Sequence, residues 1–206
     1  MIELSLPEAI ERAAALTDGG RAVLGIAGCP GAGKSTLSAA ITASVGSSVV
    51  VPMDGFHMLN KDLVRLGRRN RKGAPDTFDV GGFVAMLQRV RHQSAGEILT
   101  APRYDRAASA PVPDAITVAP DVALVITEGN YLLLEDSPWN EVRPLLDEVW
   151  FADVDDAVRV PRLIARHIQF GKTPDEAEEW VMRSDEANAA LVASTRNRAD
   201  VVVHLP

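Results

Sequence analysis

The sequence predicts an α/β fold built on a parallel sheet, and two observations support that class. Short apolar segments alternate along the chain with segments of helical periodicity, which is the pattern of repeated strand–helix–strand units. Several apolar segments end in turns that contain glycine or a carboxylate, and the ligand crevice of an open parallel sheet lies at such strand ends. With 206 residues, no internal repeat and no long linker, we expect a single domain over residues 1–206.

Five short apolar segments are the expected strands. In chain order they cover residues 23–27, 49–51, 122–127, 148–152 and 200–205. Each is too short for a buried helix and has the apolar character of a strand that is covered on both faces. We expect these five strands to form one parallel sheet in the order 2-3-1-4-5, with helices on both faces.

The helices are expected between these strands, at residues 5–17, 34–45, 58–67, 80–93, 139–146, 155–170 and from 173 onwards. Two helix starts carry a capping box, Ser5 with Glu8 and Thr173 with Glu176, each with a proline in the first turn. The segment at 100–120 is rich in proline and has little periodicity, so we expect it to be irregular.

The composition excludes several classes of protein. An apolar fraction of 47% and a charged fraction of 24% are typical of a globular domain and exclude a disordered chain. One cysteine cannot form an internal disulfide and favours a reducing compartment. No apolar run reaches the roughly 18 residues that a membrane helix needs, and the N-terminus has no signal-peptide pattern, so we expect a cytoplasmic protein without membrane insertion. The net charge of −7 argues against general nucleic-acid binding but allows a local basic pocket.

A glycine-rich turn between the first strand and its helix has the spacing G-x-x-x-x-G-K-S. Glycines let backbone N–H groups turn inward around phosphates, and the helix that follows adds the positive end of its dipole. Lys34 is placed to reach the β- and γ-phosphates, Ser35 to bind Mg²⁺ and Thr36 to support the α-phosphate side. The turn therefore predicts a P-loop NTPase fold of the nucleotide-kinase type that binds ATP and Mg²⁺ through Gly28, Cys29, Pro30, Gly31, Ala32, Gly33, Lys34, Ser35 and Thr36.

Two carboxylates follow other expected strands and should face the same crevice as the glycine loop. Asp54 follows the second strand and Glu128 the third. Phosphoryl transfer can use one carboxylate to accept the proton of the attacking hydroxyl and the other to hold Mg²⁺. No guanine-reading N-K-x-D string follows a strand and no transporter signature is present, which leaves small-molecule kinases and non-kinase ATPases.

Several strings in the chain, taken together, resemble the phosphoribulokinase / uridine kinase / bacterial pantothenate kinase superfamily, and most closely the branch labelled fructose transport system kinases. The strings are GCPGAGKST (28–36), MDGFH (53–57), RKGAPDTFD (71–79), APRYD (101–105), ITEGNYLL (126–133) and TRNRAD (195–200). The resemblance implies that Asp54 is the base for the substrate hydroxyl, that Glu128 acts with Ser35 on the Mg²⁺ side, and that Tyr104 contacts the substrate.

The resemblance also implies a small helical lid at roughly 159–178. Its arginine corresponds to Arg166, with Arg162 one helical turn earlier, and both are expected to act on the transferring phosphoryl group. Arg198 is expected beside the adenine. Two positions depart from pantothenate kinases, because Arg106 replaces a histidine and Leu163 replaces the lid tyrosine.

These observations predict a phosphotransferase that phosphorylates a hydroxyl of a small metabolite with ATP and Mg²⁺, with a sugar as the expected acceptor in a fructokinase-like reaction. Polar side chains suited to a sugar pocket are Asp54, His57, Tyr104, Asp105, Arg106 and Asn130. Pantothenate or uridine kinase activity is the alternative, and an ATP-binding regulatory or accessory protein is an alternative of another class. No nucleic-acid partner is expected, and a homodimer stays open.

A basic cluster precedes the third of the quoted strings and leaves two interpretations open. It consists of Arg65, Arg68, Arg69, Arg71 and Lys72. Such a cluster is either a solvated face or a flap that closes on an anionic substrate or product.

Overall fold

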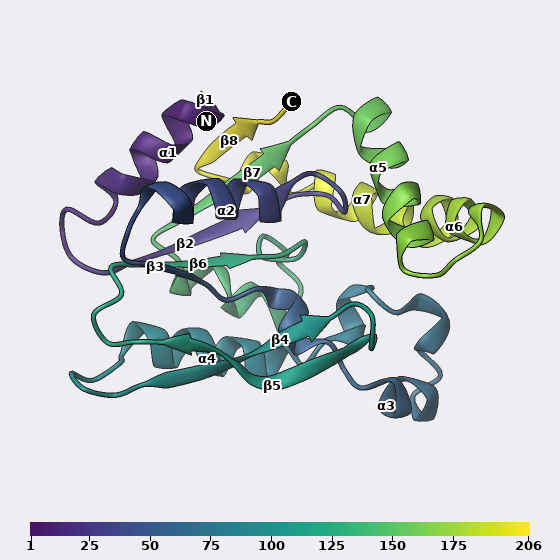
Figure 1. The fold of residues 1–206 in the computed structure, drawn as a ribbon, viewed down its shortest axis with the longest axis horizontal. Coiled ribbons are helices and arrows are strands. Elements are labelled where there is room, and N and C mark those ends of the chain that lie inside the picture. The colour runs from purple at the N-terminus through teal and green to yellow at the C-terminus, as the bar shows by residue number, and fades with distance from the viewer.

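A six-stranded parallel sheet forms the centre of the computed structural model, which describes residues 1–206 (Figure 1). Every pair of neighbouring strands is parallel. Across the sheet the strands are β1 (Ile2–Ser5), β8 (Val201–His204), β7 (Glu148–Asp153), β2 (Ala22–Ala27), β6 (Leu124–Glu128) and β3 (Ser48–Val50). The predicted order of five strands is confirmed.

The sixth strand, β1, is an addition to the five that the sequence predicts. It pairs with β8 at the edge of the sheet, and its side chains are mostly exposed. An edge strand with exposed side chains lacks the buried apolar run by which the central strands are found, so its pattern gives no strand signal.

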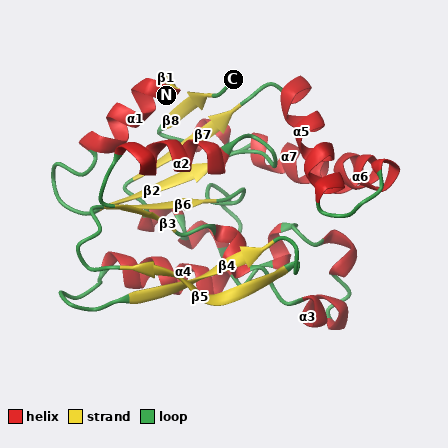
Figure 2. Cartoon of the chain, in the orientation of Figure 1, coloured by secondary structure: helices red, strands yellow, loops and turns green.

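Helices cover both faces of the sheet, and each face has its own apolar core (Figures 1 and 2). On one face α1 (Leu6–Ala15) buries Ala9 and Ala13, and α2 (Lys34–Ser44) buries Leu37 and Ile41, in one core with Leu24, Ile126 and Trp150 of the sheet. On the other face α4 (Val80–Arg91) and α7 (Glu186–Ala193) pack on the alternate residues of the same strands. The alternation of the two sets along each strand follows from the two-residue period of a β-strand.

The remaining helices lie near the carboxyl ends of the strands. They are α3 (Asn60–Arg65), α5 (Asp156–Gln169) and α6 (Pro174–Trp180), which continues through a π-helical turn (Val181–Asp185) into α7. Both predicted capping boxes are present at α1 and α6. None of the helices is both long and apolar enough to cross a membrane.

The predicted helix at 139–146 is wrong. This segment forms two short 3₁₀ turns, Trp139–Glu141 and Arg143–Leu145. Pro144 lies in the second of these turns, and a proline in the interior of a longer helix would remove one backbone hydrogen bond and clash with the preceding turn. The segment therefore breaks into two turns, and Trp139 is still buried in the core.

The predicted irregular segment at 100–120 is also wrong, because it forms an antiparallel hairpin of β4 (Leu99–Asp105) and β5 (Ala110–Val118) (Figure 2). Each strand of a two-stranded ribbon has one edge without a partner strand. A proline whose nitrogen faces that edge removes no hydrogen bond between the strands. Leu99 and Val118 anchor the ribbon in the core, and most of its other side chains are at least partly exposed. The hairpin carries Tyr104 towards the strand-end edge of the central sheet.

Candidate active site

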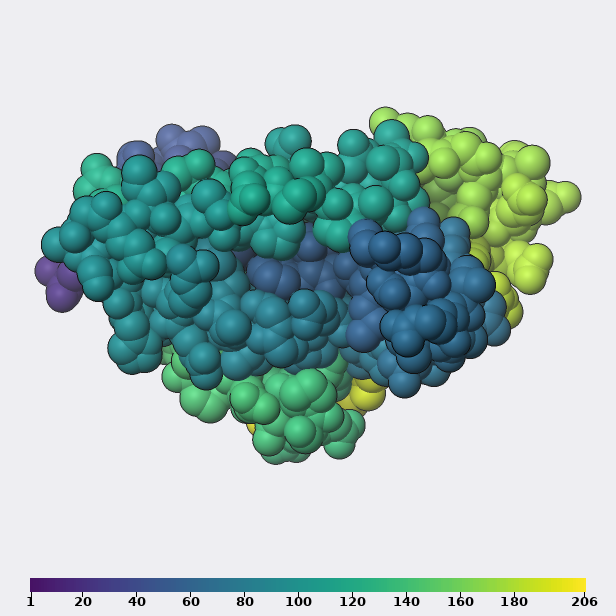
Figure 3. All heavy atoms as spheres, turned by 90° about the horizontal axis from the view of Figure 1, so that it is seen from below, coloured from purple at the N-terminus to yellow at the C-terminus, as the bar shows by residue number.

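A cleft with a volume of about 700 Å³ lies at the carboxyl ends of the central strands. Its walls come from the glycine loop, the turns after β3 and β6, the tip of the β4–β5 hairpin, residues 69–73 and the helices α5 and α6. The segment around α3 and the helices α5 and α6 lie at the same end of the molecule (Figures 1 and 3). The cleft therefore brings together segments from most of the chain.

The glycine loop has the backbone conformation that phosphate binding requires. Gly31 and Gly33 have φ values of 81° and 85°, in the region that favours glycine. A side chain at Gly31 would also meet Cγ of Leu163 at 2.7 Å. The N–H groups of Gly31 and Gly33 donate to no backbone acceptor, and the first turn of α2 leaves further N–H groups free. This array of free donors fits the polyphosphate chain of ATP.

Lys34 is buried at the base of this loop, with 8% of the residue exposed. Its Nζ donates to the carbonyl oxygens of Gly28 and Cys29 at 2.9 and 3.0 Å and to Oδ1 of Asn130 at 2.7 Å. Burial lowers the pKa of Lys34, whereas the charges of Glu128 and Asp54 act in the opposite direction. The ammonium group is held in the cleft by neutral acceptors and keeps its charge available for phosphate.

The two carboxylates predicted from the strand ends lie in this cleft. Glu128 is the last residue of β6, and Asp54 lies in the 3₁₀ turn Met53–Phe56 that follows β3. Ser35 Oγ donates to Oε1 of Glu128 at 2.9 Å. Oxygen ligands of this kind suit Mg²⁺, which takes one or two carboxylates together with substrate phosphates. The donor set therefore fits the metal that the fold implies.

The environment pushes the pKa values of the two carboxyl groups in opposite directions. Burial raises the pKa of Glu128, and the charge of Asp54 raises it further. Burial also disfavours the charged form of Asp54, but the positive groups of His57, Arg106 and Lys34 outweigh it and leave the pKa of Asp54 below its ordinary value. The neighbouring groups thus favour the charged form of Asp54.

Close backbone packing explains the glycines that follow these two carboxylates. A Cβ atom on Gly55 would lie 2.2 Å from the carbonyl oxygen of Pro102 in β4. A Cβ atom on Gly129 would lie 2.5 Å from Cβ of Met53. Only glycine allows the two turns and the hairpin to approach this closely, so these contacts set the positions of Asp54 and Glu128.

Aromatic and polar groups form the wall beside Asp54. The imidazole of His57 lies between the rings of Phe78 and Tyr104, at centroid distances of 4.0 and 4.5 Å. Its Nδ1 lies 2.8 Å from the carbonyl oxygen of Asp54. Arg106 pairs with Oδ2 of Asp54 at 3.2 Å. The structure therefore places His57, Tyr104 and Arg106 in the cleft.

Asp105 is not among the residues that line the cleft. Its Oδ1 accepts the backbone N–H groups of Ala107 and Ala108 at 2.8 and 3.0 Å. This is the local turn chemistry that aspartate provides at the end of a strand. Its contacts are those of a turn residue at the hairpin tip and give no support to a substrate contact.

Arg166 and Arg162 on α5 differ in their contacts. Arg166 lines the cleft and has no carboxylate within 4.0 Å and no side-chain hydrogen bond. Burial lowers the pKa of Arg166, and the neighbouring charge of Arg106 lowers it further. Arg162 also lines the cleft, but its Nη2 donates to the carbonyl oxygen of Pro206 at 3.0 Å. Arg166 is therefore the free guanidinium of the pair.

A third arginine, which the sequence did not single out for a role, anchors α5 to the glycine loop. Arg159 is 1% exposed, and it donates to the carbonyl oxygen of Pro30 at 3.2 Å. It also pairs with Asp156 and Glu186, both at 2.8 Å. The base of the expected lid is thus fixed against the loop, while its far end projects from the molecule (Figure 1).

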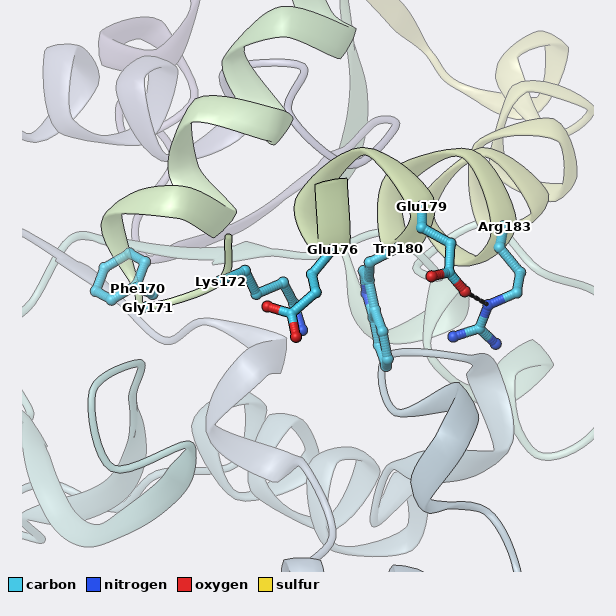
Figure 4. A pocket seen from close by; sticks show the side chains of 7 residues that line it. All are labelled: Phe170, Gly171, Lys172, Glu176, Glu179, Trp180 and Arg183. Carbon is cyan, nitrogen blue, oxygen red and sulfur yellow. Dashed lines mark ion pairs between the residues drawn. The ribbon is translucent and has the colours of Figure 1, made fainter. Parts of the chain in front are cut away.

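The far end of this helical segment carries a surface of aromatic side chains with both basic and acidic neighbours (Figure 4). Lys172 Nζ and the guanidinium of Arg183 lie 4.5 and 5.3 Å from the ring of Trp180. Arg183 also pairs with Glu179 at 3.7 Å. Lys172 and Trp180 line the main cleft as well. No sequence signal distinguished Trp180 from a core tryptophan.

Arg198 pairs with Glu135 and does not line the cleft. The cleft end beside the glycine loop is formed by Leu6, Leu205 and Pro206, and a Cβ atom on Gly33 would lie 3.1 Å from Leu205. Arg198 lies in the turn Arg196–Arg198, and its guanidinium pairs with the carboxylate of Glu135. The two residues are far apart in the sequence, so no local pattern predicts this pair.

A phosphate-binding glycine loop, a buried lysine and two strand-end carboxylates in one cleft of a parallel sheet define a P-loop kinase. A sequence profile of the phosphoribulokinase / uridine kinase family matches residues 23–205. The chain is 36% identical over 195 residues to a candidate uridine kinase of Schizosaccharomyces pombe, which covers 89% of this chain and 83% of that protein. The chain therefore belongs to the phosphoribulokinase / uridine kinase family.

Solved structures agree with this assignment. A candidate fructose transport system kinase from Silicibacter sp. TM1040 has a TM-score of 0.83 and 35% identity, over 94% of this chain and 98% of that chain. YFH7 from Saccharomyces cerevisiae has a TM-score of 0.84 over 98% of this chain and 99% of that chain. Its identity is 17%, so this likeness shows the shared fold alone.

Proposed function

We propose that the chain transfers the γ-phosphoryl group of ATP, with Mg²⁺, to a hydroxyl group of a small metabolite, and that the acceptor is a sugar or a sugar derivative. The observation that carries the proposal is the meeting of Asp54 and Glu128 with Lys34 and Ser35 in one cleft. The name of the Silicibacter protein supports fructose as the first acceptor to test.

In the proposed reaction the hydroxyl oxygen of the acceptor forms a bond to the γ-phosphorus, and the bond from that phosphorus to the bridging oxygen of ADP breaks. The hydroxyl proton passes to the carboxylate of Asp54. Lys34 and Arg166 stabilise the charge on the phosphoryl oxygens. Ser35 and Glu128 would hold Mg²⁺, which supplies charge neutralisation at the β- and γ-phosphates.

The wall beside Asp54 is suited to hydroxyl recognition. His57, Tyr104 and Arg106 provide donors and acceptors there, and Arg106 also opposes the charge of Asp54. Closing of the segment 159–178 over ATP would exclude water and bring Arg166 onto the transferring group. Arg162 supports the nucleotide side, where it is held by Pro206.

Substitution of Asp54 by Asn tests the assignment of the base. Asp54→Asn should abolish acceptor-dependent ADP formation and leave ATP affinity within a fewfold of wild type, because the amide keeps the shape and loses the basic oxygen. Lys34→Ala should weaken both ATP binding and turnover, with Lys61→Ala on the exposed face of α3 as the matched control. Normal transfer by Asp54→Asn would show that the base is another group.

A nucleoside acceptor is the second candidate, and the aromatic side chains of the cleft favour it. Tyr104, Phe170 and Trp180 all line the cleft and could stack on a base. The printed name of the Schizosaccharomyces pombe relative points the same way. An ADP-release screen of sugars, uridine and pantothenate separates these acceptors. Tight ATP binding with no accelerating acceptor, together with a retained protein partner, would favour a regulatory role.

A further inference from the structure

The basic cluster of residues 65–72 separates in the structure into two groups with different surroundings. Arg65 pairs with Asp62 at 3.4 Å on the exposed surface. Arg68 and Arg71 both pair with Asp76, at 3.3 and 2.7 Å. These three arginines pair with two carboxylates, Asp62 and Asp76, neither of which lines the cleft. They account for the solvated part of the cluster.

Arg69 and Lys72 form the second group, and both line the cleft. Arg69 has no side-chain hydrogen bond and no carboxylate within 4.0 Å. Lys72 Nζ donates to neutral acceptors only, Oδ1 of Asn60 at 2.8 Å and the carbonyl and hydroxyl oxygens of Ser109 at 2.7 and 3.2 Å. Neutral acceptors hold the ammonium in place without cancelling its charge.

Lys72 lies beside the groups proposed to bind the acceptor. Its Nζ is 5.1 Å from the ring centroid of Tyr104, and Tyr104 stacks on His57. The charges of Lys72 and Arg106 both lower the pKa of His57, in addition to its burial. Three carboxylates line the cleft, and each already has a partner: Asp54 faces Arg106, Glu128 accepts from Ser35, and Asp185 lies 2.8 Å from Nε2 of His167. The acceptor side therefore carries surplus positive charge in a protein whose net charge is −7.

The nucleotide does not account for this surplus. Lys34, Arg162 and Arg166 already serve the proposed phosphate side, with the free N–H groups of the glycine loop. Arg69 and Lys72 come instead from the segment after α3, which lines the same cleft as the glycine loop but belongs to a different part of the chain. A charged group on the other substrate is the partner that this wall lacks.

We propose that the phosphoryl acceptor carries an anionic group, a carboxylate or a phosphate ester, and that Arg69 and Lys72 bind it while its hydroxyl faces Asp54. This inference rests on the proposed kinase function and narrows the acceptor to a sugar acid or a sugar phosphate. Neutral fructose lacks the group that would occupy the Arg69–Lys72 end of the cleft. The wall favours charged over neutral acceptors because a charged acceptor can form ion pairs with Arg69 and Lys72 that a neutral one cannot form.

The test compares charged and neutral acceptors in matched pairs, with fructose against fructose 6-phosphate and glucose against gluconate. Acceptor-dependent ADP formation gives kcat/KM for each compound, and calorimetric titration with a non-hydrolysable ATP analogue gives binding without turnover. We expect a charged member to exceed its neutral partner by about 30-fold or more in kcat/KM. The comparison of fructose 6-phosphate with gluconate identifies whether the site binds a phosphate ester or a carboxylate.

The variants Arg69→Met and Lys72→Met locate the effect, with Arg65→Met as the control on the same segment. Arg69→Met removes no contact within the chain, so its fold should be intact even if Lys72→Met disturbs the hairpin. We expect each to raise KM for the charged acceptor at least about 10-fold. Arg69→Met should reduce activity on charged acceptors far more than activity on neutral ones, whereas Arg65→Met should leave both activities and the KM for ATP within about twofold of wild type.

Three outcomes would overturn the inference. They are a neutral sugar that matches its charged counterpart, equal losses by Arg69→Met on both, or no binding of any charged compound in the titration. Failure of the proposed function is a separate result. Binding of charged compounds that depends on Arg69, with no acceptor accelerating ADP formation, would remove the kinase assignment and retain the anion site.

Discussion

Gly55 offers the sharpest test of how the fold positions the candidate base. A Cβ atom at this position would lie 2.2 Å from the carbonyl oxygen of Pro102 and 2.8 Å from its carbonyl carbon. Both atoms belong to backbone, so no side-chain rotation can relieve the clash. Gly55→Ala therefore forces the turn that holds Asp54 and the hairpin strand β4 apart.

The size of the effect follows from these distances. The Cβ–oxygen distance must widen from 2.2 Å to at least 3.0 Å before it enters the range of real contacts. A displacement of about 1 Å at a reacting group costs about 100-fold in rate. The strain also costs about 1–3 kcal/mol of folding free energy, which lowers Tm by about 2–12 °C in a domain of this size.

The assay measures acceptor-dependent ADP formation at a temperature where both proteins are folded, together with ATP affinity and Tm. We expect kcat to fall about 100-fold. ATP affinity should change little, because the glycine loop lies on β2 and not on this turn. Gly46→Ala is the control, because nothing lies within 4 Å of the position of its Cβ. A Gly55→Ala protein with wild-type kcat and Tm would refute the argument.

Two further predictions concern stability. Arg159→Met should lower the free energy of unfolding by about 3 kcal/mol, because it leaves the acid Glu186 and the carbonyl of Pro30 without their buried partner. Urea unfolding checks this, and a loss no larger than that of the exposed Arg65→Met would contradict it. Glu148→Gln tests a pH-dependent contact: burial raises the pKa of Glu148, but Arg12 at 2.6 Å and Nε1 of Trp150 at 2.7 Å lower it below its ordinary value. Because the folded protein holds the pKa of Glu148 below its unfolded value of 4.5, the ionised carboxylate stabilises the fold above that pH, and this stabilisation is lost as the pH falls through the folded pKa. The difference in the free energy of unfolding between wild type and Glu148→Gln should therefore be about 1–2 kcal/mol near neutral pH and shrink in acid. A gap that is constant with pH would count against this assignment.

Local sequence determined the nucleotide side of this protein. The glycine loop, its lysine and its serine are contiguous, and a strand before them with a helix after them is enough to give their backbone its shape. The carboxylates of Asp54 and Glu128 could be placed because parallel strands deliver their carboxyl ends to one edge of a sheet. The order of the five strands followed the same logic, and the added edge strand did not disturb it.

Tertiary contacts decided the acceptor side, because the direction of a side chain depends on neighbours that are distant in sequence. Pairing of β4 with β5 is invisible to a local pattern that its prolines interrupt, yet this hairpin carries Tyr104 to the cleft. Asp105 and Arg198 turn away because a hairpin tip and a distant acid provide their partners. The basic cluster separates into two groups: three of its arginines pair with Asp62 or Asp76, whereas Lys72 is held by neutral acceptors and Arg69 has no ion-pair partner. Charge along a chain is a local property, whereas its neutralisation depends on which acids the fold brings within reach.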